Sequence, residues 1–328
     1  MADRIRWGIR GAGNIARKFA EGLQALPDVE LLAIGSRSQE SADRFGDEFG
    51  IPRRYADYRA MAEDGDIDAV YVGTPHPMHK DDTILYLKAG KAVLCEKPFA
   101  VNRPQAAEMV RVAREEGVFL MEAMWTRFLP SVVQTRKWLA EEIIGEPRMV
   151  QADFGFRAGF DEESRLFDPE YAGGGLLDVG VYCVSFASMV FGGPPIRIAG
   201  LANLGNTGVD EQSCAVLEYE GGALAAVSSA VRTTTAQEAR IMGTEGMIHL
   251  HSNFWCGTDV TLSIQGQEPQ HFVFPLVGNG YNYEADAVAL ALRDGRLESR
   301  IMPLDESLTI METMDRLRAQ WGLSYPME

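Results

Sequence analysis

Four residues have side chains suited to acid–base chemistry beside a bound ligand: Glu96, Lys97, Asp178 and Tyr182. Glu96 and Lys97 follow residues 92–95, a short apolar run that predicts a buried strand of a parallel sheet. Ligands of open α/β sheets bind at the carboxyl ends of strands, so Glu96 and Lys97 fall where chemistry is placed. A lone lysine at a strand end is more often a solvated surface group, so the assignment depends on the rest of the chain.

Asp178 and Tyr182 lie in a different kind of element. Three glycines, at 173–175, precede an apolar stretch that predicts a helix from about residue 176 to residue 190. The two residues are four positions apart and therefore share one helix face. An acid and a phenol on one face of an apolar helix are suited to proton transfer. Taken alone, the pattern fits an ordinary core tyrosine with a bonded hydroxyl better.

The elements that must position these residues begin with a dinucleotide fingerprint. A strand over residues 5–9 meets a G-x-G-x-x-A motif, Gly11-Ala12-Gly13-Asn14-Ile15-Ala16. Gly11 allows the tight turn, Gly13 lets a pyrophosphate approach the backbone, and Ala16 lets the next helix pack on the strand. The helix that begins near Asn14 directs its N-terminal N–H groups at the phosphates.

The second strand, residues 29–34, indicates which nucleotide is bound. A site that prefers NAD has an acid after this strand, which binds the ribose 2′-hydroxyl. This chain has Ser36, Arg37 and Ser38 instead, two hydroxyls and a guanidinium that suit a 2′-phosphate. We therefore predict NADP(H), with NAD(H) as the less favoured alternative. Ser38 also suits the cap of the helix over residues 39–49, which does not account for the missing acid.

A third strand, residues 68–72, ends at another loop that we expect to line the cofactor groove. Thr74, Pro75 and His76 form this loop, and His79 lies in the first turn of the helix that follows. His76 and His79 lack a third ligand nearby, which argues against a metal pair. Strands and helices continue to alternate up to residue 121, so residues 1–123 predict a doubly wound parallel sheet of Rossmann type.

Residues 124–328 predict a second domain with a large, open, mainly antiparallel sheet. Its expected strands are residues 149–156, 196–204, 213–219, 223–231, 239–243, 246–251, 259–264 and 271–274. Several of them are joined by short turns that contain glycine. His249 and His251 lie on one face of a strand, and we interpret them as structural and expect no metal. The outer face of an open sheet has to be covered, so we predict a homodimer that packs through this sheet.

Composition narrows the class of protein. The chain has 328 residues, enough for two full cores, and a net charge of −16, which argues against nucleic acid or an anionic membrane as partner. The four cysteines are far apart and indicate neither disulfides nor zinc. We expect no signal peptide and no apolar run long enough to span a bilayer, and hence a cytoplasmic enzyme.

Taken in order, the fingerprint, Glu96-Lys97-Pro98 and the D-x-G-x-Y motif at Asp178–Tyr182 resemble the Gfo/Idh/MocA oxidoreductases. The resemblance covers essentially the whole chain. It is strongest to the subgroup of dimeric dihydrodiol dehydrogenases and NADP-dependent D-xylose dehydrogenases, through residues 73–77, 122–128, 177–183 and 320–326. Many family members have histidine where this chain has Tyr182, which argues against an inositol dehydrogenase of the histidine type.

The resemblance implies a mechanism. Hydride moves between the nicotinamide and a carbon of a sugar, polyol or vicinal diol, and Tyr182 is the general acid/base. A phenol has a pKa of about 10, and the Lys97 cation lowers it. Asp178 binds a substrate hydroxyl or orients the lysine, and Glu96 contacts the nicotinamide ribose or carboxamide. The bond between Lys97 and Pro98 is often cis in this family.

The expected site is as follows. The cofactor contacts are Gly11, Gly13, Asn14, Ile15, Ser36, Arg37, Ser38, Thr74, Pro75, His76, His79, Glu96 and Lys97. The catalytic residues are Lys97, Tyr182 and Asp178, and the last two also bind substrate. Trp125, Arg127, Phe154 and Phe156 are candidate pocket walls, for which substrate contact and plain packing both stay open.

Two other functions remain as alternatives. Some family members hold the dinucleotide tightly and use it for internal oxidation and reduction, either between two sugars or in glycoside cleavage. A sensor that binds NADP without chemistry is the other alternative. It has no need of Lys97, Asp178 and Tyr182 together, so an enzyme is favoured.

Overall fold

The computed structural model describes residues 4–328, and residues 1–3 of the predicted first domain lie outside this range. The chain divides into two compact units. The first comprises the chain up to Ala100 with Pro104–Trp125 and Val277–Ser307. The second comprises Val101–Arg103, Thr126–Leu276 and Leu308–Glu328.

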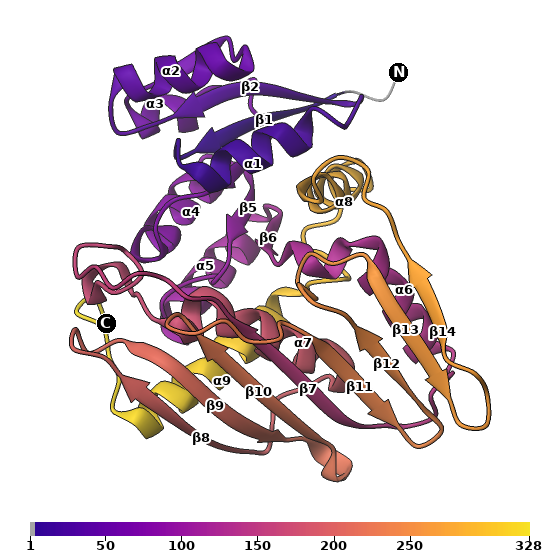
Figure 1. The fold of residues 1–328 in the computed structure, drawn as a ribbon. Coiled ribbons are helices and arrows are strands. Elements are labelled where there is room, and N and C mark those ends of the chain that lie inside the picture. Colours follow the sequence, from indigo (N-terminus) through magenta and orange to yellow (C-terminus); the bar gives the residue numbers. More distant parts are fainter. Residues whose placement is uncertain (1–3) are drawn as a thin grey trace. The chain divides into compact units, whose positions relative to one another are not determined.

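The first unit contains a parallel sheet with the Rossmann strand order β3-β2-β1-β4-β5-β6 in the described part of the chain (Figure 1). Its strands are β1 (Ile5–Arg10), β2 (Val29–Gly35), β3 (Arg53–Tyr55), β4 (Ala69–Val72), β5 (Ala92–Glu96) and β6 (Leu120–Ala123). The helices between them are α1 (Asn14–Leu23), α2 (Gln39–Phe49), α3 (Tyr58–Ala62), α4 (His79–Lys88) and α5 (Arg103–Glu116). The predicted doubly wound fold is confirmed. The strands β4 and β5 are buried along their full length, as the continuous apolar runs indicated.

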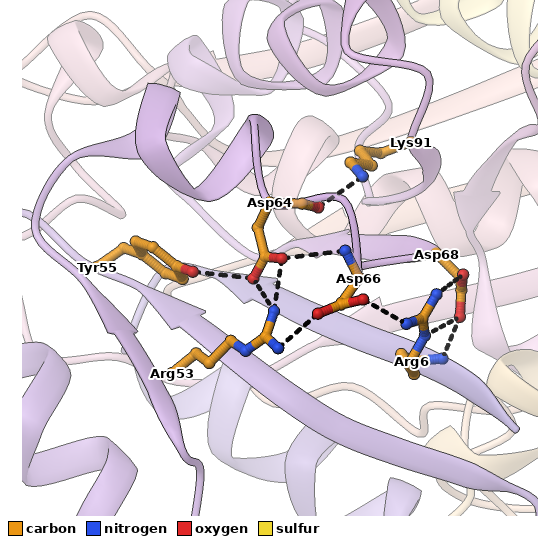
Figure 2. Close-up of polar contacts among 7 residues, drawn as sticks. All are labelled: Arg6, Arg53, Tyr55, Asp64, Asp66, Asp68 and Lys91. Carbon is orange, nitrogen blue, oxygen red and sulfur yellow. Dashed lines mark hydrogen bonds and ion pairs between the residues drawn. The ribbon is translucent and has the colours of Figure 1, made fainter.

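A network of ion pairs links the amino-terminal ends of these strands, opposite the carboxyl ends where Glu96 and Lys97 were predicted to act (Figure 2). Arg6 at the start of β1 bonds both carboxylate oxygens of Asp68, just before β4. Arg53 of β3 contacts Asp64 at 2.6 Å and Asp66 at 2.6 Å. Lys91, just before β5, donates to the carbonyl of Asp64. Because these charges join neighbouring strands at the edge away from Lys97, we assign them to the stability of the sheet.

Residues 277–307 belong to the first unit, although the sequence analysis assigned them to the second domain. They include α8 (Tyr281–Arg293), which packs closely on α1. A Cβ on Gly22 of α1 would lie only 3.0 Å from the Cβ of Tyr281. Arg293 at the end of α8 forms an ion pair with Asp28, 2.5 Å away. Contacts between residues so far apart in sequence leave no local pattern. The order of elements along the chain therefore did not indicate that residues 277–307 group with the first unit.

The second unit contains a sheet whose described strands have the order β14-β13-β12-β11-β7-β10-β9-β8 (Figure 1). Its strands are β7 (Pro147–Gly155), β8 (Arg197–Leu204), β9 (Asp210–Glu218), β10 (Leu224–Ala230), β11 (Ala239–Gly243), β12 (Gly246–Leu250), β13 (Asp259–Ile264) and β14 (Gln270–Val273). All its pairings are antiparallel except that of β7 with β10. The predicted mainly antiparallel sheet is therefore confirmed, with one parallel pair at its centre.

Helices of the same unit cover one face of this sheet (Figure 1). They are α6 (Pro130–Ala140), α7 (Val181–Phe191) and the part of α9 (Leu304–Trp321) from Leu308 onward. The helical stretch Pro169–Phe191 is long and apolar enough to cross a membrane, with a mean hydropathy of 1.6, which corrects the expectation that no run of this kind exists. Since 83% of its most apolar window is buried inside the protein, its apolar surface belongs to the core.

Candidate active site

The fingerprint turn after β1 can accommodate only glycine at Gly11. Its φ is +107°, and a Cβ would lie 2.8 Å from the carbonyl oxygen of Gly73. The N–H of Gly11 donates to the carbonyl of Gly35 at the end of β2, and the N–H of Gly73 donates to the carbonyl of Arg10 at the end of β1. The turn therefore joins the carboxyl ends of three adjacent strands, β2, β1 and β4.

Gly13 has a different reason to lack a side chain. A Cβ there would meet nothing within 4 Å among the described residues, so no protein packing requires glycine. Gly13 is the N-cap of α1, and no side chain caps the helix start at Asn14 and Ile15. Open space in front of uncapped N–H groups fits a pyrophosphate, which these amides and the helix dipole would bind.

A buried ion pair behind the turn was not foreseen from the sequence. Arg10 Nη2 lies 3.1 Å from Asp82 Oδ1, and both side chains are largely buried. Thr74 donates to the other oxygen of Asp82 at 2.9 Å. The Arg10 guanidinium lies over the ring of Tyr58, 3.3 Å from its centroid. Asp82 therefore ties the loop at Thr74 to the end of β1.

The end of β2 presents the three residues predicted to select NADP. Ser36 is buried, and its N–H donates to the carbonyl of Tyr55. Arg37 is exposed. Ser38 caps α2 by accepting from the N–H of Ser41 at 3.3 Å, as its sequence context indicated. Of the three, Arg37 is thus the side chain most able to reach a bound phosphate.

His79 is fully buried and joins two strand-end loops. Its Nδ1 lies 2.9 Å from the Pro98 carbonyl, and its Nε2 lies 2.8 Å from the Thr74 carbonyl. Burial lowers the pKa of His79 to about 4, although both carbonyls favour the protonated ring. Because no ring atom is exposed, the structure gives His79 a positioning role rather than a cofactor contact. His76 and Pro75 belong to the short 3₁₀ turn His76–Met78 and its N-cap.

Glu96 and Lys97 lie at the carboxyl end of β5, where the apolar run predicted them. Glu96 Oε1 accepts a hydrogen bond from the hydroxyl of Tyr71, and Oε2 accepts from the N–H of Lys97 at 3.1 Å. The Lys97–Pro98 peptide bond is cis, as the resemblance implied. Glu284 of α8 is fully buried, and burial together with the Glu96 charge raises its pKa well above the usual range.

In the second unit, Asp178 lies in a short π-helical segment, Leu176–Gly180, and Tyr182 lies in the first turn of α7. The sequence predicted one continuous helix here. Single π turns occur frequently at functional sites. Arg165 lies 3.2 Å from Asp178 Oδ1, while Asp178 itself is mostly buried.

Asp210 organises the start of this segment. It accepts the N–H of Leu176 at 2.6 Å and is fully buried at the start of β9. Gly174 has a φ of +110°, and a Cβ there would lie 2.2 Å from Asp210 Oδ1, so a larger residue cannot fit. Burial raises the pKa of Asp210 to about 7, against the effect of the Leu176 amide.

An aromatic cluster surrounds Tyr182, and one of its members was missed from the sequence. Phe154 lies 5.5 Å from Tyr182 between ring centroids, and Trp255 lies 6.0 Å from it. Phe154 and Trp255 stack at 4.8 Å. Trp255 follows β12 in a turn that carries no motif, so only the fold brings it to Tyr182.

The other three candidate wall residues have packing partners of their own. Phe156 packs against the cluster of Leu166, Phe167 and Val231. Arg127 is buried and donates to the hydroxyl of Ser185 at 3.1 Å and to its carbonyl at 2.7 Å, which anchors it to α7. Trp125 belongs to the first unit, where it stacks on Tyr281 at 4.3 Å. Of the four, the structure thus brings Phe154 into contact with Tyr182.

The comparisons with known proteins agree with this architecture. Residues 5–124 match the family model for "Oxidoreductase family, NAD-binding Rossmann fold", and residues 132–249 match that for the GFO/IDH/MocA C-terminal domain. The chain is 38% identical to the trans-1,2-dihydrobenzene-1,2-diol dehydrogenase of Mus musculus, covering 99% of both chains. It is also 38% identical to the enzyme of that name from Xenopus tropicalis, over 98% of this chain and 99% of the relative.

Among solved structures, the 3-ketoreductase KijD10 from Actinomadura kijaniata, in complex with NADP and TDP-benzene, is 29% identical. Its TM-score is 0.86, and the match covers 97% of this chain and 98% of KijD10. The aldose-aldose oxidoreductase from Caulobacter crescentus, 24% identical over 96% of this chain and 97% of its own, shares the fold with a TM-score of 0.89.

The chain belongs to the Gfo/Idh/MocA oxidoreductase family, as the sequence motifs predicted. It is therefore an oxidoreductase with a nicotinamide-nucleotide-binding Rossmann domain.

Proposed function

We propose that this protein is an NADP-dependent dehydrogenase of a sugar, polyol or vicinal diol, similar to aldose or trans-dihydrodiol dehydrogenases. One observation carries the proposal: the first unit has a lysine directly after β5, and the second unit has an acid and a tyrosine on one helical segment. The relatives named as dihydrodiol dehydrogenases match it from end to end, which supports the same chemistry over the whole chain.

Each residue has a defined task in this proposal. Tyr182 takes the proton of the substrate hydroxyl during oxidation and returns it during reduction. Lys97 stabilises the phenolate form of Tyr182, and Asp178 binds a substrate hydroxyl or orients Lys97. The bound nicotinamide supplies the hydride chemistry at the same substrate carbon. Oxidation therefore converts the alcohol to a carbonyl, with the hydride on the nicotinamide and the proton on Tyr182.

We assign the cofactor to the strand ends of the first unit. The amides at Gly13, Asn14 and Ile15 would bind the pyrophosphate. Arg37 would bind the 2′-phosphate, a role that its exposed position and the NADP complex of KijD10 support. Thr74, Pro75 and His76 would line the groove, and Glu96 would face the nicotinamide half. His79 keeps the positioning role that its burial indicates.

The substrate pocket draws on the aromatic cluster of the second unit. Phe154 and Trp255 support the ring of Tyr182 and would form one apolar wall beside it. Trp125, Arg127 and Phe156 remain proposed members of the site, acting through the elements that they pack against.

We also propose a homodimer through the open face of the second sheet. This face has a hollow of about 690 Å³ whose lining includes Leu201 and Val216. Leu201 is 83% exposed, far more than is usual for leucine, and a second copy would cover it. A solution mass equal to that of one chain would contradict this assignment. The acidic composition and the separate cysteines support a cytoplasmic location.

The first experiment measures NADP reduction across a panel of aldoses, deoxy and anhydro sugars and trans-dihydrodiols, with NAD in parallel. Turnover of one class, stronger with NADP, is the expected result. Tyr182→Phe and Lys97→Met should fold, bind NADPH and lose about 10²- to 10⁴-fold in kcat. Tyr171→Phe and Lys88→Met change the same groups at exposed positions and should keep wild-type rates.

Two outcomes would contradict the proposal. Near wild-type turnover in Tyr182→Phe or Lys97→Met would refute the assigned roles. Protein that carries its dinucleotide through desalting and gives no net turnover would instead favour internal oxidation and reduction.

A further inference from the structure

A cluster of two imidazoles and a carboxylate lies on the second sheet and includes none of the residues assigned to the proposed reaction. It consists of Glu238, His249 and His251, each of which offers a ligand atom within 4.8 Å of the others. His249 belongs to β12, His251 follows its end, and Glu238 comes just before β11. The spacing of the two histidines alone suits a metal no better than a solvated sheet face, which is why the sequence indicates a structural role for both.

Strand pairing brings the third ligand to them. In the antiparallel register of β11 and β12, Ala239 pairs with Leu250 and Arg240 pairs with His249. Continuing this register by one position places Glu238 opposite His251. Residues two apart on a strand lie on the same face, so both imidazoles and the carboxylate face the same side of the sheet. The histidine rings are 4.1 Å apart between centroids.

Two atoms of the cluster lie at the separation expected of ligands that share one cation. His249 Nε2 is 3.1 Å from Glu238 Oε2 and is closed off from solvent. Tetrahedral ligands of Zn²⁺, about 2.0–2.2 Å from the metal, are about 3.3 Å from one another, close to this separation.

Outer-shell support is also present. His251 Nε2 lies 2.8 Å from the hydroxyl of Thr261 on β13. With the proton on Nε2, His251 donates to Thr261 and keeps a lone pair on Nδ1, the arrangement that orients metal-binding histidines.

We propose that Glu238, His249 and His251 bind a divalent transition-metal cation of the Zn²⁺ type, with water as a fourth ligand. Two histidines and one carboxylate are an established zinc ligand set. The cation would link the start of β11 to the end of β12. One group opposes it: Arg240 contacts Glu238 Oε2 and is 38% exposed, so it must swing away when the cation binds.

Titration of the protein and its variants with Zn²⁺ tests the proposed site. Chelator-treated full-length protein is titrated with Zn²⁺ by calorimetry, and thermal unfolding is recorded with and without Zn²⁺. We expect one cation per chain and a rise in Tm as Zn²⁺ binds the folded state. His249→Asn should abolish both effects. Thr261→Val should weaken binding by about 10- to 100-fold through the outer shell. Arg240→Met should strengthen binding.

His271 provides the matched control. It lies near the cluster, 5.6 Å from His251 between ring centroids, but it is not one of the three ligands. His271→Asn should bind Zn²⁺ as the wild type does. Binding that survives His249→Asn, that is lost in His271→Asn, or that amounts to half a cation per chain would overturn the site as assigned. Dehydrogenase activity is not needed for any of these measurements, so the outcome is independent of the proposed function.

Discussion

Tyr71 donates its phenolic hydrogen to Glu96, and both side chains are closed off inside the first unit. They come from the adjacent strands β4 and β5. Lys97 donates its N–H to the second oxygen of the same carboxylate. Glu96, which we assign to the nicotinamide half of the cofactor, is thus oriented by Tyr71 and Lys97 before any ligand binds. Glu284 is buried beside it, and burial together with the Glu96 charge raises the pKa of Glu284 well above its usual range.

We predict that Tyr71→Phe lowers the free energy of unfolding by about 2 kcal/mol, because a buried hydrogen bond to a charged group is lost. Tyr86→Phe is the matched control. Tyr86 is equally buried, but its hydroxyl donates to the sulfur of Met61, at 3.6 Å, rather than to a charged group. Tyr86→Phe should lower the free energy of unfolding by well under half as much as Tyr71→Phe does. Urea unfolding of both variants checks this, and equal losses would show that the bond to Glu96 carries no special weight.

Asp82→Ala should be among the most damaging changes in the first unit. It leaves the Arg10 guanidinium buried without its carboxylate, which costs about 3–5 kcal/mol. The neighbouring Asp81 has an 81% exposed side chain and pairs with Lys80. Asp81→Ala should therefore cost less than about 1 kcal/mol. A small loss in Asp82→Ala, measured by denaturant titration, would mean that Arg10 finds water or another acceptor.

Arg37→Ala tests the choice of nucleotide. Loss of a charge-assisted contact to the 2′-phosphate should weaken NADPH binding by about 10- to 100-fold and leave NADH binding unchanged. Arg44→Ala on the exposed side of α2 should change neither affinity. Fluorescence titrations with the two reduced nucleotides distinguish the cases. An equal loss for NADPH and NADH would point to a general effect on the fold.

Asp210 should make stability depend on pH. Its pKa is about 7 when folded and 3.8 as the ordinary value, so the folded state holds the proton more tightly. The resulting stabilisation is complete below about pH 4 and is lost as pH rises through 7, about 4 kcal/mol in total. Asp210→Asn removes this dependence.

The measurement is the difference in unfolding free energy between Asp210→Asn and wild type at pH 5 and pH 8. We expect the variant to gain relative to wild type at the higher pH. His79, whose pKa is lowered, contributes an opposite slope between about pH 4 and 6.5, and this slope cancels in the difference. A difference that does not change with pH would show that Asp210 ionises freely in the folded protein.

Much of the first unit could be predicted because its signals are local. The apolar runs that became β1, β2, β4 and β5 are bounded by the glycine, serine and charged residues that end them. A parallel strand buried on both faces needs such a run, and a dinucleotide turn needs glycine where φ is positive or a phosphate approaches. The family and the fold followed from these short stretches and their order.

The tertiary structure decided what depends on contacts distant in sequence. In the folded chain α8 belongs to the first unit, and β7 pairs with β10 in parallel. The tertiary structure also buried Arg10 against Asp82 and brought Trp255 beside Tyr182. It also placed Glu238 next to His249 through the strand register. Spacing along the chain specifies which face of an element is apolar, but not which other element covers it. That choice depends on packing and on the burial of charge, which only the folded chain defines.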